Sequence, residues 1–249
     1  MLRRIELPRP RSSAGFVIVA HRGNRKHCPE NSLAAFRKAI DEGADLLETD
    51  LRPSADGAFV CFHDPFLDRM TDGSGRVEEL ALADLRKFRL RQAHRIWKDE
   101  SIPLLGEVAA ICPPDVALAL ELKSAQFDDP AVCAALVREL SRLQLLKKVI
   151  VLSFHRRRLA ALQRVAPDIP VGLVALFPWP RGGSDLLGPI PPILYVNPWY
   201  VREAHRKGQF ICPLDSRPEK RIRHYRRLGV DALLTDDPAA TIAATRSVR

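Results

Sequence analysis

The 249-residue chain lacks several features that would assign it to other classes of protein. Its five cysteines form no CxxC pair, which argues against a structural zinc site or a disulfide framework and favours a reduced, cytoplasmic protein. No apolar run approaches the roughly 20 residues of a membrane-spanning helix. No clear cleavage site follows the basic N-terminus, and no GxGxxG motif follows the first predicted strand. We therefore expect a cytoplasmic protein with neither a membrane span nor a dinucleotide-binding motif.

Aromatic residues are also scarce, at 6%, whereas basic residues are abundant. The 39 lysines and arginines exceed the 30 acidic residues, giving a formal charge of +9. Such an excess suits a polyanionic ligand, which includes phosphate esters, nucleic acid and anionic lipid headgroups. The charge is scattered along the chain, as on solvated helix faces, and no glycine-arginine repeat accompanies it. The charge alone does not decide the function, and nucleic acid is not the expected partner.

Hydrophobic patterning predicts eight strands that alternate with amphipathic helices. The predicted strands cover residues 16–20, 46–51, 116–122, 149–154, 171–176, 193–196, 209–212 and 232–235. Residues 58–62 follow a turn signal and are predicted to return as a short hairpin strand after the second strand, and residues 177–192 are predicted to form an irregular loop. The alternation predicts an α/β fold, a (β/α)₈ TIM barrel, more strongly than a six-stranded doubly wound sheet. We expect a single domain over residues 14–249 and a flexible tail over residues 1–13.

Acidic side chains occupy the polar ends of two predicted strands. Glu48 and Asp50 are two residues apart on one strand, so both side chains point to the same face, and Glu121 and Lys123 repeat this spacing on another. In a barrel, polar strand ends open into the active-site mouth. Three converging carboxylates would repel one another unless a cation held them, and oxygen ligands suit Mg²⁺ or Ca²⁺. Taken singly, each acid would more simply form a surface salt bridge.

His21 and His63 also end predicted strands, and Arg22 follows the first of them. A lone histidine is more often structural than catalytic, but two beside a metal site favour proton transfer near neutral pH. Arg22 and Lys123 would supply the positive charge that a phosphate ester needs. Together these groups predict phosphodiester chemistry.

The same residues belong to motifs that occur in order along nearly the whole chain. The chain resembles the glycerophosphodiester phosphodiesterase family in the segments His21-Arg22-Gly23, Pro29-Glu30-Asn31-Ser32, Glu48-Thr49-Asp50, His63-Asp64-Pro65, Thr71-Asp72-Gly73, Ile102-Pro103-Leu104, Glu121-Leu122-Lys123, Ser153-Phe154, Gly229-Val230-Asp231 and Thr235-Asp236-Asp237-Pro238. Each segment alone is weakly specific, but the set as a group is specific.

The resemblance implies a metal-dependent TIM-barrel enzyme that hydrolyses glycerophosphodiesters to glycerol 3-phosphate and an alcohol. It implies that the metal ligands are Glu48, Asp50 and Glu121, that the general acid–base pair is His21 and His63, and that Arg22 and Lys123 hold the phosphate. The alternatives for the attacking group, water or the substrate's own 2-hydroxyl, stay open. So do the assignment of the two histidines, the choice of Mg²⁺ or Ca²⁺, and a monomer or a homodimer.

The chain departs from the family pattern at two places. Where the family usually has Trp-Thr-Val-Asn, this chain has Cys212-Pro213-Leu214-Asp215, so the loss of the tryptophan removes an apolar wall of the pocket. The segment 63–102 is short for an elaborate cover, which predicts an open mouth. A phospholipase D-like enzyme acting on lysophospholipids or sphingolipids is the main alternative. A non-catalytic barrel that binds phosphorylated ligands or nucleic acid is the other.

Overall fold

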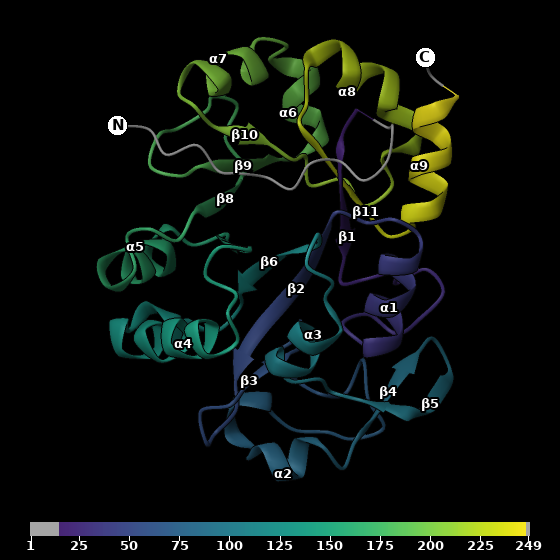
Figure 1. The fold of residues 1–249 in the computed structure, drawn as a ribbon, viewed down its shortest axis with the longest axis vertical. Coiled ribbons are helices and arrows are strands. Elements are labelled where there is room, and N and C mark those ends of the chain that lie inside the picture. Colours follow the sequence, from purple (N-terminus) through teal and green to yellow (C-terminus); the bar gives the residue numbers. More distant parts are fainter. Residues whose placement is uncertain (1–14, 248–249) are drawn as a thin grey trace.

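The computed structural model describes residues 15–247, and the predicted tail over residues 1–13 lies outside them. Eight parallel strands form the barrel in the order β10-β9-β8-β7-β6-β2-β1-β11 (Figure 1). They are β1 (Val17–His21), β2 (Leu46–Pro53), β6 (Ala117–Leu122), β7 (Val149–Ser153), β8 (Val171–Ala175), β9 (Leu186–Pro189), β10 (Phe210–Ile211) and β11 (Ala232–Thr235). The two ends of this order meet where Asp231 N donates to Ile211 O (3.1 Å) and Ile211 N donates to Asp231 Oδ2 (2.7 Å). The predicted TIM barrel is confirmed.

Helices surround the strands, and several of them begin at a capping side chain or a proline. They are α1 (Leu33–Asp41), α3 (Leu105–Ile111), α4 (Pro130–Arg142), α5 (Arg156–Val165), α6 (Pro191–Val196), α7 (Tyr200–Arg206), α8 (Ile222–Leu228) and α9 (Pro238–Arg246), with the short 3₁₀ helices η2 (Ala125–Asp128) and η3 (Pro218–Arg221). The Ser32 side chain accepts a hydrogen bond from Ala35 N at the start of α1, and Asp129 caps α4 in the same way. Such caps satisfy amide groups that have no partner within the helix.

One predicted strand is wrong. Residues 193–196 belong to helix α6, and the strand at this place is β9, inside the stretch predicted as an irregular loop. Two prolines start α6, where a helix tolerates them, and a four-residue apolar run does not by itself distinguish a strand from a buried helix turn. The described residues 176–185, which connect β8 to β9, form no helix. The number of barrel strands is therefore as predicted, although one of them is displaced.

The predicted hairpin is present, and a folded insertion follows it. Strand β3 (Phe59–Cys61) pairs antiparallel with the end of β2. After it come η1 (Val77–Glu79), α2 (Leu82–Leu85) and the two-stranded sheet of β4 (Arg89–Gln92) and β5 (Arg95–Ser101). This insertion has a small core of its own, which comprises Val60, Phe62, Leu67, Met70, Val77, Leu85, Leu90 and Ile102. It lies beyond the carboxyl end of β2, the end that carries the candidate site (Figure 1).

The side chains that point into the barrel form an apolar layer, and an acidic layer follows it towards the carboxyl ends of the strands. Val17, Val19 and Leu46 belong to an inner cluster, whereas Ile18 and Leu47 alternate with them along the strands and pack outwards against the helices. Leu46 has the same parity as Glu48 and Asp50 on β2, so the acidic side chains point to the inner face, beyond the apolar residues.

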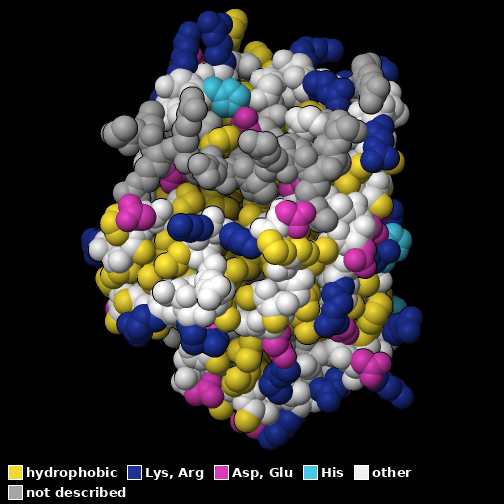
Figure 2. Space-filling model, viewed as in Figure 1, with side chains coloured by type: hydrophobic (Ala, Val, Ile, Leu, Met, Phe, Trp, Pro, Cys, Tyr) yellow, Lys and Arg dark blue, Asp and Glu magenta, His cyan; other side chains and the backbone are white. Residues whose placement is uncertain are grey.

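On the one face that Figure 2 shows, the basic side chains do not form a single patch. Lysine and arginine side chains are scattered among acidic and neutral ones on this face. Among the described residues, no helix combines the length and the apolar character that crossing a membrane requires.

Candidate active site

Three buried carboxylates meet at the inner face of β2 and β6. Asp50 lies opposite Glu121 in the register of the two strands, and Glu48 lies two residues before Asp50. One oxygen of each carboxylate lies within 4.8 Å of an oxygen of the other two. Glu48, Asp50 and Glu121 are 3%, 0% and 8% exposed, so water screens their repulsion poorly. The structure therefore brings together the acids that the sequence predicts as metal ligands.

The pKa values of the three carboxyl groups diverge. Burial, followed by the charges of Asp50 and Glu121, raises the pKa of Glu48 well above its ordinary value. Burial also raises the pKa of Glu121, in part against the effect of Lys123. Burial acts in the same direction on Asp50, but the charges of Arg22 and Lys123 outweigh it and lower the pKa of that group. A cation between the three groups would offset the mutual repulsion that adds to the effect of burial on Glu48 and Glu121.

Two basic side chains border the acids. Arg22 Nε lies 3.0 Å from Asp50 Oδ2, and the Arg22 backbone amide donates to Glu48 Oε2 at 3.0 Å. Lys123 Nζ lies 2.8 Å from Glu121 Oε1 and 3.3 Å from Asp50 Oδ1. Both cations are largely buried, with 11% and 14% of their side chains exposed. The structure thus places the two predicted phosphate-binding groups beside the acidic cluster.

An unusual backbone conformation holds Arg22 in place. Its φ is +55°, and that of Asn31 is +57°, a region that residues other than glycine seldom adopt. The amide of Asn31 donates to Arg22 O at 3.0 Å, so the two positions support each other. The Asn31 side chain also donates to Asp50 Oδ2 (2.9 Å) and accepts from Thr49 Oγ1 (2.8 Å). Asn31 therefore orients Asp50.

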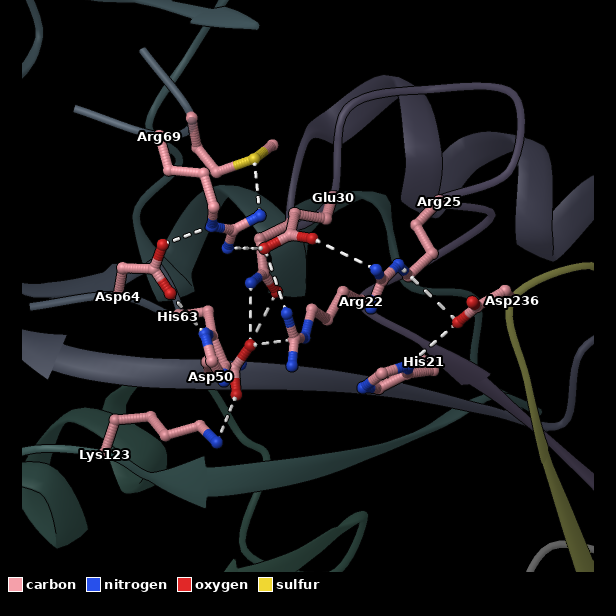
Figure 3. Close-up of polar contacts among 12 residues, drawn as sticks. His21, Arg22, Arg25, Glu30, Asp50, His63, Asp64, Arg69, Lys123 and Asp236 are labelled. Carbon is pink, nitrogen blue, oxygen red and sulfur yellow. Dashed lines mark hydrogen bonds and ion pairs between the residues drawn. The ribbon is translucent and has the colours of Figure 1, made fainter. Parts of the chain in front are cut away.

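The two predicted histidines each bond a carboxylate through Nδ1 (Figure 3). His21 Nδ1 lies 2.8 Å from Asp236 Oδ1, and His63 Nδ1 lies 2.6 Å from Asp64 Oδ1. Burial lowers the pKa of both histidines, although the paired carboxylates act in the opposite direction. A neutral imidazole that donates through Nδ1 keeps Nε2 as a proton acceptor. Asp236 and Asp64 lie within motifs noted in the sequence, but the motifs alone assigned them no partner.

Further charged residues border this centre, and the ion pairs among them were not predicted. Glu30, whose side chain is 6% exposed, lies within ion-pair distance of three arginines: Arg22, Arg25 and Arg69. Arg69 comes from the insertion, and its partner Asp64 is next to His63. The Pro-Glu-Asn motif marked Glu30, but no feature of the sequence indicated that Arg69 would reach it.

The donor set fits a hard divalent cation. The three carboxylates offer only oxygen atoms, which are the ligands that Mg²⁺ and Ca²⁺ prefer. Asp50 Oδ1 is buried and accepts no hydrogen bond from the described residues, and its contact there is the ion pair with Lys123. A buried carboxylate oxygen without a donor is costly unless a cation binds it.

Cys212 belongs to the inner apolar cluster of the barrel. Its side chain is 9% exposed and packs with residues that include Val17, Leu46 and Leu186. Asp215, which stands where the family usually has asparagine, accepts hydrogen bonds from Tyr225 OH (2.7 Å) and Arg221 Nη1 (3.0 Å). A small buried thiol thus stands at the position where the family usually has a tryptophan.

A TIM barrel with three inward carboxylates, two carboxylate-paired histidines and two flanking cations defines a class of phosphodiesterase. Comparisons with known proteins give the family. Residues 21–240 match the model of the glycerophosphoryl diester phosphodiesterase family, and the chain belongs to that family. The predicted resemblance and the predicted enzyme class are confirmed.

The relatives cover almost the whole chain. A glycerophosphodiester phosphodiesterase from Caldanaerobacter subterraneus is 29% identical over 92% of this chain and 98% of its own length. The crystal structure of a glycerophosphodiester phosphodiesterase from Agrobacterium tumefaciens superposes with a TM-score of 0.77 at 25% identity, covering 91% of this chain and 99% of that one. The structure of a phosphodiesterase from Oleispira antarctica, in complex with the product sn-glycerol-3-phosphate, has a TM-score of 0.82 at 25% identity, covering 92% and 96%.

Proposed function

We propose that this enzyme hydrolyses glycerophosphodiesters to glycerol 3-phosphate and an alcohol. The observation that carries the proposal is the convergence of His21 and His63, each paired through Nδ1, with Arg22 and Lys123 on one buried acidic cluster. The bound product in the Oleispira antarctica phosphodiesterase and the name of the Caldanaerobacter subterraneus relative support this choice of substrate.

Glu48, Asp50 and Glu121 would hold one divalent cation, Mg²⁺ or Ca²⁺. When bound, such an ion polarises the phosphoryl oxygens and offsets their charge. Arg22 and Lys123 flank the same cluster and hold the phosphate from its side. Arg22 Nε faces Asp50 and Nη1 donates to Glu30, so the guanidinium would offer its remaining N–H groups to phosphate oxygens, whereas Lys123 offers a point charge. Their low exposure strengthens both contacts, because little water competes for them.

The two histidines move the protons. With Nδ1 bonded to Asp236 or Asp64, each ring directs Nε2 towards the substrate. One neutral imidazole takes the proton of the attacking oxygen, which belongs to water or to the 2-hydroxyl of the glycerol. The other, in its protonated form, gives a proton to the leaving alkoxide. The carboxylate behind each ring stabilises the charge that the ring carries during this exchange.

The decisive experiment measures glycerol 3-phosphate release from a panel of glycerophosphodiesters and one lysophospholipid, with Mg²⁺, with Ca²⁺ and with EDTA. We expect metal-dependent release from the diesters. The variants His21→Ala and His63→Ala should each lose at least about 100-fold in kcat, within the range of acid–base catalysis. His205→Ala, which removes a histidine paired with Asp231 away from the site, is the matched control. Turnover of the lysophospholipid alone, or activity of the two variants within a few-fold of wild type, would overturn the proposal.

A metal titration tests the ligand set separately. Glu121→Gln keeps the shape of the side chain but removes one charge, so it should raise the metal concentration that half-maximal activity requires. An unchanged titration would exclude Glu121 from the ligands.

A further inference from the structure

Glu30 is the point at which three arginines meet. Its Oε1 accepts hydrogen bonds from Arg22 Nη1 at 3.0 Å and from Arg69 Nη2 at 2.6 Å. Its Oε2 lies 3.7 Å from Arg25 Nη2. The pKa of Glu30 is lowered because the three arginines outweigh the effect of burial. The carboxylate is thus ionised and enclosed by cations, and it lies outside the acidic cluster proposed to bind metal.

Two of these arginines lead to the two histidines (Figure 3). Arg69 also donates through Nε to Asp64, which bonds His63 Nδ1 at 2.6 Å. On the other side, Arg25 Nε lies 3.6 Å from Asp236 Oδ1, the atom that bonds His21 Nδ1 at 2.8 Å. A continuous series of charge contacts therefore runs from one imidazole to the other, and its midpoint is Glu30.

We propose that Glu30 is the positioning residue that sets both imidazoles relative to the phosphate held by Arg22. This inference rests on the proposed function, since it assumes that the two histidines act on one phosphodiester. A carboxylate orients an imidazole only if the carboxylate is itself fixed, and here each is fixed through an arginine that Glu30 holds. The guanidinium is planar, so the direction of its donors is set once one side is bound. Errors of about 1 Å in such positions reduce rates on the order of 100-fold.

The two halves of the series differ in strength. The half that reaches His63 consists of direct hydrogen bonds, whereas the half that reaches His21 contains two contacts of 3.6 and 3.7 Å. Arg69 should therefore control His63 more strongly than Arg25 controls His21. Replacing Glu30 should disturb both histidines, because among the described residues only Glu30 forms ion pairs with both Arg25 and Arg69.

Imidazole NMR tests this inference without activity. In the full chain with ¹⁵N-labelled histidine, Glu30→Gln keeps the shape of the side chain and should shift the ring signals of both His21 and His63. Arg69→Gln should shift His63 alone, and Arg25→Gln should shift His21 alone and by less. The signals of His205 and His224, which lie on α7 and α8, serve as internal controls. Ring signals of His21 and His63 that stay in place in Glu30→Gln would overturn the inference.

Kinetics with two substrates that differ in their leaving group distinguish a positioning role of Glu30 from a loss of folded enzyme. Glu30→Gln should lower kcat at least about tenfold more for an alkyl glycerophosphodiester than for a p-nitrophenyl one, because a nitrophenolate needs no protonation. KM should stay within about threefold. The control is Glu107→Gln, which weakens the ion pair between Glu107 of α3 and Arg86 of the insertion and should affect both substrates alike.

Equal losses of kcat on the two substrates would show a merely structural role and overturn the inference. If the wild type releases no glycerol 3-phosphate, the proposed function fails, and the imidazole signals still decide whether Glu30 positions the two rings.

Discussion

Lys123 Nζ lies 2.8 Å from Glu121 Oε1, so a group proposed to bind phosphate neutralises a group proposed to bind metal. The pair lies within one short stretch of chain, since Glu121 is in β6 and Lys123 is the first residue after that strand. Lys123 also lies 5.4 Å from the centroid of the Phe154 ring, which holds the ammonium over the aromatic face. Before metal and substrate bind, the lysine therefore compensates part of the charge of the acids.

This contact predicts that Lys123→Met binds metal more tightly while it loses activity. Methionine carries no charge, so the mutual repulsion of the acids is left uncompensated. Binding of a divalent cation then relieves more repulsion and is more favourable than in wild type. We expect a metal Kd roughly tenfold lower at pH 8, given the size of Coulomb interactions at a partly buried site. Calorimetric titration with Mg²⁺ measures this, and the control is Lys148→Met at the residue that precedes β7. A weaker affinity for Mg²⁺ in Lys123→Met would contradict it.

Glu48→Gln should stabilise the metal-free protein in a pH-dependent manner. Because burial and its acidic neighbours raise the pKa of Glu48 in the folded state, Glu48 contributes full stability below its ordinary value of 4.5 and loses it as pH rises through the raised value. Glutamine does not titrate, and its amide oxygen still accepts from Arg22 N. The free energy of unfolding of the variant should therefore exceed that of wild type by a growing amount as pH rises. The full difference is about 1.4 kcal/mol for each unit by which the pKa of Glu48 is raised.

Urea denaturation in EDTA at pH 5 and pH 8 measures this difference in the free energy of unfolding. The advantage of Glu48→Gln should be larger at pH 8, and added Mg²⁺ should stabilise wild type more than the variant. An equal difference at both pH values would show that the charge of Glu48 is not the cause.

The turn that carries Arg22 predicts unequal effects of two glycine substitutions. Gly23 and Gly57 both have left-handed φ values, +77° and +82°, so alanine costs about 1 kcal/mol at either position for the backbone alone. At Gly23 a Cβ would also lie 2.6 Å from the backbone carbon of Ala35 in α1, whereas at Gly57 it meets no atom within 4 Å.

Gly23→Ala should therefore lower the free energy of unfolding by clearly more than Gly57→Ala, because the clash involves backbone that cannot move aside. It should also lower activity, since relief of the clash displaces the adjacent Arg22. Chemical denaturation of the two variants measures how much each substitution lowers the free energy of unfolding. Equal costs would mean that α1 shifts freely away from the turn.

The barrel and its acidic centre follow from local pattern, which explains why both were predictable. Alternation along β2 assigns Leu46, Glu48 and Asp50 to one face, and the parallel pairing with β6 then brings Glu121 opposite Asp50. The strand predicted at residues 193–196 failed because its four apolar residues carry no period, and the packing of the barrel decides which apolar run becomes β9.

The outer parts of the site depend on contacts between distant segments. Asp236 reaches His21 across 215 positions, and Arg69 reaches Glu30 only because the insertion folds on its own small core. Single motifs mark such residues, but pairing them requires the three-dimensional arrangement.

The buried position of Cys212 predicts the outcome of restoring the tryptophan that the family usually has. Cys212 packs in the inner apolar cluster, and its carbonyl lies 3.3 Å from where a Cβ on Gly188 would stand, so the space is close-packed. Cys212→Trp adds a large ring there and should lower the free energy of unfolding by about 1–3 kcal/mol, the usual cost of overpacking. Cys212→Ala, which removes only the thiol, should cost less.

In the folded fraction, Cys212→Trp should change the preference among glycerophosphodiesters more than it changes the metal requirement. The reason is that the ring adds to the apolar wall of the barrel interior while Glu48, Asp50 and Glu121 keep their positions on β2 and β6. Relative kcat/KM values across the diester panel, measured beside a Mg²⁺ titration, test this. A metal titration that moves while the preferences stay fixed would show that the added ring displaces the acids and does not reshape the pocket.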